Sequence, residues 1–186
     1  MTQKRLFNLP DNEYQYWNPF EYSGKLYIFE HLKAKKLEFK NPYNSDTYKI
    51  YTTISHHVFT VGYNQKKHSN PAKLYAGKPV DKREFCNERY SLSFHLPKLL
   101  ETLPEQFCYH GSFKKYCVCK LNDENNNPIF YQVVFRVWKV PSKIRLHVES
   151  AYPLGNRPSK PKKVGFYTIC YNLLRNKKMP IPPNHL

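Results

Sequence analysis

Two adjacent histidines, His56 and His57, are the residues of this sequence best suited to acid–base chemistry. An imidazole changes its charge near neutral pH, so it could take the proton of an RNA 2′-hydroxyl group. Successive side chains of a strand point to opposite faces, so only one of the two would face a cleft. We favour His57, because the same alternation places the aromatic ring of Phe59 beside it. The alternative is a pair of ordinary polar residues at a strand end.

Two arginines, Arg83 and Arg89, lie in a charged segment that follows. A guanidinium group is a planar fork that binds phosphate through two hydrogen bonds, so either arginine could stabilise a pentacovalent phosphorane. The alternative is that both are solvent-exposed charges on a helix, paired with Glu84 and Glu88. Spacing alone favours this alternative.

A basic loop in the last quarter of the chain is the third candidate. Its dense cations repel one another unless an anion binds between them, and the amides of the helix predicted to follow also favour phosphate. Tyr152, just before the loop, could protonate a leaving 5′-oxygen or stack on a base. The alternative is an ordinary surface loop. The nucleic-acid-binding candidates are Arg157, Lys160, Lys162 and Lys163, together with Lys66 and Lys67 of an earlier basic loop.

Metal chemistry has weaker support in the sequence. Four soft ligands occur at Cys108, His110, Cys117 and Cys119. A structural zinc site usually has a two-residue gap between its cysteines, and this spacing is absent. Buried strand thiols are the favoured interpretation, so we predict no metal site and no cofactor.

The elements that position these residues are predicted most clearly in the second half of the chain. Ile144, Leu146 and Val148 alternate with polar residues, which is typical of a half-buried strand. Short connections between strand-like segments favour antiparallel neighbours. The predicted meander comprises residues 113–121, 129–140 and 144–151, and a helix is predicted over residues 164–174.

The first half of the chain adds further strands and helices. We expect strands at 25–32, 36–40 and 46–62, and the last of these is either one strand or two strands broken near His56. The remaining predictions are a basic loop at 63–80, a helix at 81–90, a strand or extended segment at 91–96 and a helix at 97–103. The predicted fold class is α+β: a twisted antiparallel β-sheet, made of the C-terminal three-strand meander plus earlier strands, with a few helices on one side.

The chain is predicted to form one domain. Residues 1–24 form an irregular N-terminal segment that packs over an edge of the sheet, anchored near Trp17. Residues 25–178 form the single α+β domain, because 186 residues suffice for one ordinary core. Residues 179–186 form a proline-rich tail.

Composition points to a polyanionic partner. The sequence has 30 Lys and Arg residues against 14 Asp and Glu residues, a formal net charge of +16. Such a charge attracts nucleic acid first and a membrane surface second. The 16 tyrosines and 12 phenylalanines could stack on bases as well as form a core. No apolar segment is long enough to span a membrane, and the five cysteines without an export signal predict reduced thiols in the cytoplasm.

Three short groups of residues carry a resemblance to known proteins. They are similar to small bacterial and phage-borne proteins called stationary-phase growth adaptation proteins. The layout of residues 25–170 in turn resembles the barnase, EndoU, colicin and RelE group of ribonuclease toxins, although the N-terminal segment and the 63–80 loop are longer here. The three groups are His57-Val-Phe-Thr60; Arg83, Glu88-Arg89-Tyr90, Ser91 and Leu96-Pro97; and Glu149-Ser150-Ala151-Tyr152-Pro153.

The resemblance implies helices joined to a four-stranded antiparallel sheet, and metal-independent RNA cleavage through a 2′,3′-cyclic phosphate. Carried over by position, it assigns catalytic roles to His57, to Arg83 or Arg89, to Ser150 and to Tyr152. A toxin of this kind, in a toxin–antitoxin pair or in phage defence, implies an acidic antitoxin or inhibitor that covers the basic cleft.

The resulting hypothesis is a metal-independent endoribonuclease that binds RNA, with His56 as the alternative to His57. Two other functions stay open. The protein could be a non-catalytic basic module that binds nucleic acid, or an interaction factor that binds an acidic protein partner.

Overall fold

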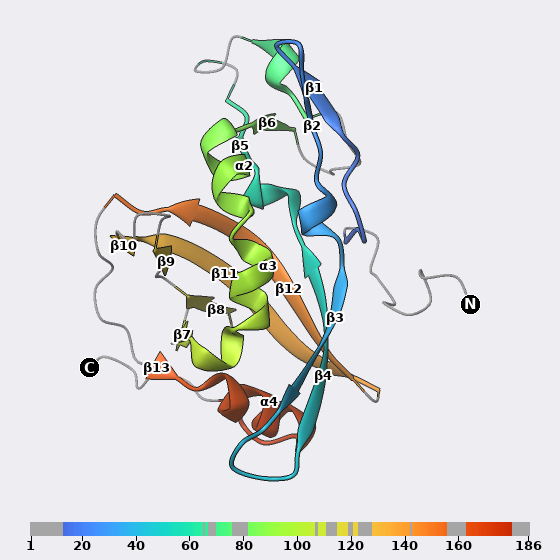
Figure 1. Cartoon of the computed structure of the whole chain (residues 1–186), viewed down its shortest axis with the longest axis vertical. Coiled ribbons are helices and arrows are strands. Elements are labelled where there is room, and N and C mark those ends of the chain that lie inside the picture. The colour runs from blue at the N-terminus through green and yellow to red at the C-terminus, as the bar shows by residue number, and fades with distance from the viewer. Residues whose placement is uncertain are drawn as a thin grey trace.

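A seven-stranded sheet forms the centre of the molecule (Figure 1). The computed structural model describes residues 13–64, 66, 70–75, 82–106, 108–110, 115–118, 121–122, 128–141, 143–155 and 163–179. The strand order is β13-β7-β8-β11-β12-β4-β3. The strands are β3 (Lys35–Lys40), β4 (Thr47–Ile54), β7 (Cys108–His110), β8 (Lys115–Val118), β11 (Tyr131–Val140), β12 (Lys143–Pro153) and β13 (Lys163–Val164).

Strands β8, β11 and β12 form the predicted antiparallel meander, and the α+β fold class is confirmed. One pair departs from the antiparallel pattern, because β12 pairs with β4 in parallel. Their sequence separation explains why the pattern could not predict this direction: no tight turn joins β4 to β12, so the chain can return in either direction.

The sheet has an apolar inner face and a polar outer face. Along β11, Val133, Phe135 and Val137 are buried, whereas Arg136 and Trp138 point to the other side. The inner face packs against two short helices, α3 (Leu96–Glu101) and α4 (Phe166–Leu174), whose apolar side chains belong to the same core (Figure 1). None of the helices among the described residues has the length and hydrophobicity needed to cross a membrane.

A second group of elements lies at the upper end of the molecule in Figure 1. Its core is aromatic: the rings of Phe29 and Phe59, for example, stack with centroids 4.1 Å apart. It comprises β1 (Phe20–Tyr22), β2 (Lys25–Tyr27), β5 (Thr60–Gly62), β6 (Arg83–Phe85), α2 (Asn87–Ser93) and the 3₁₀ turns η1 (Glu30–Leu32), η2 (His56–Val58) and η3 (Pro71–Lys73). The remaining elements are η4 (Leu103–Glu105), β9 (Leu121–Asn122) and β10 (Pro128–Ile129).

Several boundaries differ from prediction. The helix predicted at 81–90 is wrong in its first half, because residues 83–85 pair with β5 as strand β6 and bury Phe85. The segment predicted to be extended at 91–96 continues helix α2 instead. The strand predicted at 25–32 ends at Tyr27. Of the two alternatives for residues 46–62, the structure has the break near His56, and the helix predicted over residues 164–174 is present from Phe166 to Leu174.

Residues 13–17, named here the N-terminal strap, cross the outer face of the sheet. The indole Nε1 of Trp17 donates a hydrogen bond of 2.9 Å to the carbonyl of Ile54, at the end of β4. The amide of Ala34, just before the edge strand β3, donates to the carbonyl of Gln15 at 2.7 Å. Glu13 reaches residues of β4 and β12. The strap therefore spans neighbouring strands without itself forming a strand or helix.

Candidate nucleic-acid interface

The two predicted histidines lie in the 3₁₀ turn η2 and not on a strand. The side chain of Ser55 caps this turn by accepting a hydrogen bond from the amide of His57 at 3.2 Å. His56 is only 7% exposed and its ring lies 5.2 Å from that of Trp17, whereas His57 is half-buried. The strand alternation used to choose between them is therefore wrong, since Phe59 is fully buried in the aromatic core. His57 is still the more accessible imidazole.

Arg89 contacts this turn, and both predicted arginines contact Thr60 of the strand that follows it. Arg89 donates through Nη1 to the carbonyls of His57 at 3.0 Å and Thr60 at 2.9 Å. Arg83 donates through Nε to the hydroxyl of Thr60 at 2.9 Å. Neither is a purely solvated helix charge, and burial lowers the pKa of Arg89 below its ordinary value. These guanidinium groups hold the backbone of the turn in place.

Ser150 and Tyr152 lie at the end of β12. A bulge follows Val148, and beyond it Ser150 pairs with Val134 while Tyr152 pairs with Gln132, so both belong to the outer face. The guanidinium carbon of Arg89 is 5.3 Å from the centre of the Tyr152 ring. The structure therefore brings the histidines, the arginines and Tyr152 together. We name this group the histidine turn: His56, His57, Thr60, Arg83, Arg89 and Tyr152.

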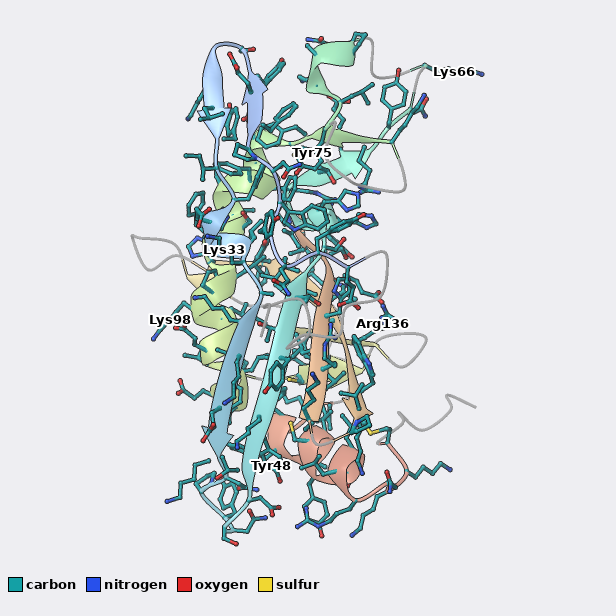
Figure 2. All side chains as sticks on the ribbon, turned by 90° about the vertical axis from the view of Figure 1, so that its right-hand side faces the viewer. Lys33, Tyr48, Lys66, Tyr75, Lys98 and Arg136 are labelled. Atoms are coloured by element: carbon teal, nitrogen blue, oxygen red, sulfur yellow. The ribbon has the colours of Figure 1, made fainter. Side chains whose placement is uncertain are left out.

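The predicted basic loop is mostly outside the described residues, which exclude Lys67, Arg157, Lys160 and Lys162. Lys163 is exposed in β13, at the opposite edge of the sheet from β3. Lys66 lies at the upper end of the molecule (Figure 2). The expected meeting of the basic loop with the histidine turn stays a prediction.

A second cationic region was missed in the sequence. On the outer face, the guanidinium groups of Arg136 and Arg145 each lie 5.4 Å from the ring of Trp138. On the neighbouring strand, the ammonium group of Lys143 lies 4.7 Å from the ring of Tyr51. These contacts place cations beside partly exposed rings on three adjacent strands, β11, β12 and β4. We name this region the aromatic–cation face: Lys36, Lys49, Tyr51, Arg136, Trp138, Lys143 and Arg145.

The aromatic–cation face is open to solvent over part of its area. The side chain of Arg136 is 45% exposed although it pairs with Glu149. Lys36 stands opposite Tyr51 across the β3–β4 pair, and Lys49 is exposed on β4. Figure 2 shows Arg136 and Lys98 of α3 pointing out on opposite sides of the molecule, so Arg136 lies away from the helix-covered side. The alternation of residues 131–140 was the sequence signal that could have found this face.

The strap buries a charged network beside this face. Glu13 Oε2 accepts hydrogen bonds from Arg145 Nη2 at 2.7 Å and from the Thr53 hydroxyl at 2.6 Å. The Thr53 oxygen also lies 2.9 Å from His147 Nδ1. A hydroxyl has one proton, which Thr53 gives to Glu13, so His147 Nδ1 carries the hydrogen that points to Thr53. Burial, with nearby Arg136, lowers the pKa of His147 to about 4.

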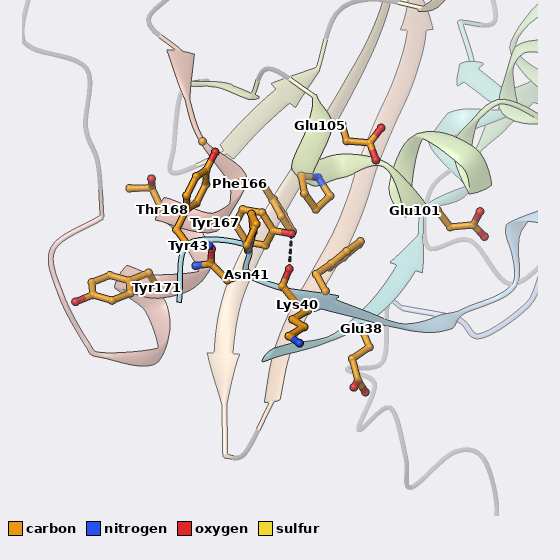
Figure 3. Close-up of a pocket in the computed structure, with 14 residues that line it drawn as sticks. Glu38, Lys40, Asn41, Tyr43, Glu101, Glu105, Phe166, Tyr167, Thr168 and Tyr171 are labelled. Carbon is orange, nitrogen blue, oxygen red and sulfur yellow. Dashed lines mark hydrogen bonds between the residues drawn. The ribbon is translucent and has the colours of Figure 1, made fainter. Parts of the chain in front are cut away.

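A hollow of about 650 Å³ lies at the other end of the molecule, between α4, η4 and the β3–β4 connection (Figure 3). The hydroxyl of Tyr167 donates to the carbonyl of Lys40 at 2.9 Å in its wall. Two of its carboxylates, Glu38 and Glu101, already pair with lysines. It contains none of the predicted site residues, so we assign it no role in the candidate site.

Metal ligands do not gather within the described part of the chain: no group of three or more His, Cys, Asp or Glu residues there could hold a metal ion. Cys86, Cys108 and Cys170 are free thiols. The side chains of Cys117 and Cys119 lie outside the described residues.

Comparison with known proteins identifies the family. The model of the YjaZ family matches residues 19–174. The chain is also 34% identical over 179 residues to Protein YjaZ of Escherichia coli strain K12, across 96% of this chain and 94% of that protein. No solved structure matches significantly. The predicted resemblance to stationary-phase growth adaptation proteins and ribonuclease toxins is therefore wrong. Its motifs were short. The sheet that they implied has four antiparallel strands, whereas the observed sheet has seven strands and one parallel pair. This chain belongs to the YjaZ family.

Proposed function

We propose that this protein binds single-stranded RNA on the aromatic–cation face of its sheet. The observation that carries the proposal is the arrangement around Trp138, whose ring centre lies 5.4 Å from the guanidinium carbons of both Arg136 and Arg145. Proteins that bind single strands combine rings on which bases stack with cations that follow the phosphate backbone. Both groups are present here on adjacent strands of one sheet.

The spacing of the two rings suits consecutive nucleotides. Trp138 pairs with Arg145 across β11 and β12, and Arg145 pairs with Tyr51 across β12 and β4. Neighbouring strands are about 4.8 Å apart, so the backbones at Trp138 and Tyr51 are separated by about 10 Å. That distance is long enough for two unstacked bases to lie at the two rings, with Lys143 on the strand between them. A base-paired duplex cannot offer its ring faces in this way, so the face favours single strands.

The net charge of +16 supports the same ligand class. A polyanion is attracted at long range, and neutralising its phosphates releases counterions. Glu38, Glu149 and Glu13 partly neutralise the outer face. The attraction is therefore shared with cations elsewhere on the molecule, whereas the face provides the stacking.

The test compares a fluorescently labelled 12-nucleotide RNA with the same strand in a duplex, in EDTA, by fluorescence anisotropy. We expect the single strand to bind at least tenfold more tightly. We also expect the logarithm of its binding constant to fall linearly with the logarithm of the salt concentration, by about 0.7 for each phosphate contacted. Equal affinity for the duplex would contradict the stacking proposal. Binding of neither RNA would favour the alternative of an acidic protein partner.

A second candidate function is metal-independent RNA cleavage at the histidine turn. The convergence of His57, Arg89 and Tyr152 favours it, because an imidazole, a phosphate-binding cation and a phenol can together assist 2′-hydroxyl attack. However, Nη1 of Arg89 already donates to two carbonyls, which reduces the donors left for phosphate. Cleavage therefore ranks below binding.

Cleavage is tested by incubating total RNA with the protein in EDTA, beside His57→Ala and the control His95→Ala. The proposal predicts products ending in a 2′,3′-cyclic phosphate from the wild-type protein and from the control, and at least a hundredfold less product from His57→Ala. Intact RNA with the wild-type protein, or cleavage that requires magnesium, would eliminate this function and leave binding alone. We place either activity in the cytoplasm, where the free thiols of Cys86, Cys108 and Cys170 would stay reduced.

A further inference from the structure

The donors around Glu13 belong to the central sheet, whereas the acceptor belongs to the strap. Arg145 and His147 lie on β12 and Thr53 lies on β4, so two paired strands hold the donors. Glu13 belongs to the strap, which forms no strand or helix. Segments of this kind open locally at lower free-energy cost than the central strands of a sheet.

The chemistry of this network is that of an anion site. It offers a guanidinium group, a hydroxyl group and a nearby imidazole to a single carboxylate oxygen, and the Glu13 and Arg145 side chains are each 1% exposed. Arginine, the residue type at position 145, is preferred for binding phosphate as well as carboxylate. These donors are therefore of the kind that binds a phosphate oxyanion as well as a carboxylate.

The position of this network connects it to the aromatic–cation face. The guanidinium group of Arg145 contacts the ring of Trp138 on one side and the carboxylate of Glu13 on another. A nucleotide stacked on Trp138 would have its phosphate within reach of Arg145. The strap occupies the place that this phosphate would take.

We propose that Arg145, Thr53 and His147 form a phosphate-binding site, which Glu13 occupies in the free protein and leaves when a phosphate binds. The strap is thus an internal competitor that lowers the affinity of the outer face for anions. The nature of the natural ligand, an RNA phosphate, rests on the proposed function, but the site itself does not. Inorganic phosphate is a sufficient probe.

The experiment measures binding of inorganic phosphate to wild-type protein and to Glu13→Gln, by isothermal titration calorimetry and by the shift in melting temperature. Glutamine keeps the size of the side chain and removes its charge. We expect Glu13→Gln to bind phosphate at least tenfold more tightly than wild type. At the same phosphate concentration, its melting temperature should rise by more than that of wild type. The matched control is Glu21→Gln, an exposed glutamate of β1, which should behave as wild type.

A second variant covers the case in which Glu13→Gln does not fold. Trp17→Phe removes the hydrogen bond from the indole to Ile54 and so loosens the strap, while the residues Glu13 and Arg145 are not substituted. It should raise phosphate affinity severalfold. In both variants, adding Arg145→Gln should abolish the gain. If neither variant binds phosphate more tightly than wild type, the network is a purely structural ion pair and the inference fails.

RNA binding by the same variants separates this inference from the proposed function. Tighter phosphate binding together with tighter single-stranded RNA binding supports both. Tighter phosphate binding with no RNA binding by any variant supports the anion site and contradicts the RNA proposal. Tight RNA binding by wild type that is unchanged in Glu13→Gln and Trp17→Phe supports the RNA proposal and contradicts the role of the strap.

Discussion

In the histidine turn, Arg89 donates hydrogen bonds to two backbone carbonyls. On the aromatic–cation face, Arg136 lies beside the ring of Trp138, and 45% of the Arg136 side chain is exposed. Both regions combine cations with aromatic rings. In the turn, the donors are used to stabilise the fold, and one imidazole is packed on Trp17. On the face, Arg136 lies over the ring of Trp138 and Lys143 over the ring of Tyr51, and both cations still contact solvent. A cluster of suitable residue types is therefore not sufficient, because a donor that the fold itself requires, such as Arg89 Nη1, is not free to bind a ligand.

Substituting Arg145, the buried cation of the aromatic–cation face, should have the largest effect on stability. Arg145→Met leaves the carboxylate of Glu13 buried without its guanidinium partner, so we expect the free energy of unfolding to fall by about 3–5 kcal/mol. Urea denaturation followed by circular dichroism measures this. The double variant Glu13→Leu, Arg145→Met should recover most of the loss, since no charge is then buried alone. A double variant no more stable than Arg145→Met would show that the pair is not the reason.

Acid should destabilise the protein through two neutral histidines. The pKa values of His147 and His31 are each about 4 in the folded protein, against an ordinary value of 6.5. Between these pH values the unfolded chain binds protons that the folded one does not. Stability is therefore complete above about pH 6.5 and decreases as the pH falls toward 4. The contribution of His147 is on the order of 3 kcal/mol.

The slope of unfolding free energy against pH measures this effect. His147→Gln and His31→Gln should each reduce the slope between pH 4 and 6.5 by about one proton, and the double variant by about two. Burial is the first cause of both shifts. The charged groups near His147 are Glu13, whose Oε2 lies 3.6 Å from Nδ1, and Arg136, Glu149, Arg145 and His57. An unchanged slope in both single variants would show that the folded and unfolded chains bind protons equally at these histidines.

Substituting Arg89 distinguishes stabilisation of the turn from ligand binding. Arg89→Met removes charged hydrogen bonds to two carbonyls, so we expect a loss of about 1.5–3 kcal/mol in the free energy of unfolding. RNA affinity should change by less than about twofold, because these donors do not lie on the aromatic–cation face. The control is Lys82→Met, an exposed cation just before β6. A large loss of RNA affinity with unchanged stability would reverse the roles assigned to the two regions.

Substituting Arg136 should give the smallest change in stability. Its ion pair with Glu149 is partly exposed, and such pairs contribute about 0–1 kcal/mol. Arg136→Gln should therefore melt within a few degrees of wild type. If Arg136 contacts one phosphate, the slope of log binding constant against log salt concentration should be smaller by about 0.7 in this variant than in wild type. A salt dependence equal to that of wild type would exclude Arg136 from the interface.

The sequence pattern predicted the meander and helix α4, because alternation and three-to-four spacing are local properties of residues 129–151 and 164–174. It did not predict that β4 and β12 pair in parallel, which depends on where the chain returns. The histidines were identified, but their turn was not, because Trp17 and the aromatic core determine which of them is buried. Glu13 was not identified, because its partners Thr53 and Arg145 are 40 and 132 positions away in the sequence.

The most direct test of RNA binding on the outer face compares Trp138→Ala with Tyr43→Ala. Tyr43 is 87% exposed beside the hollow of Figure 3, away from the aromatic–cation face, so its substitution controls for the general loss of a surface ring. Stacking of a base contributes about 1–3 kcal/mol, which corresponds to about 5- to 150-fold in affinity. The measurement is anisotropy of a labelled single-stranded RNA in EDTA at fixed salt. We predict that Trp138→Ala binds at least fivefold more weakly and Tyr43→Ala binds as wild type; equal affinities of all three proteins would contradict RNA stacking on this face.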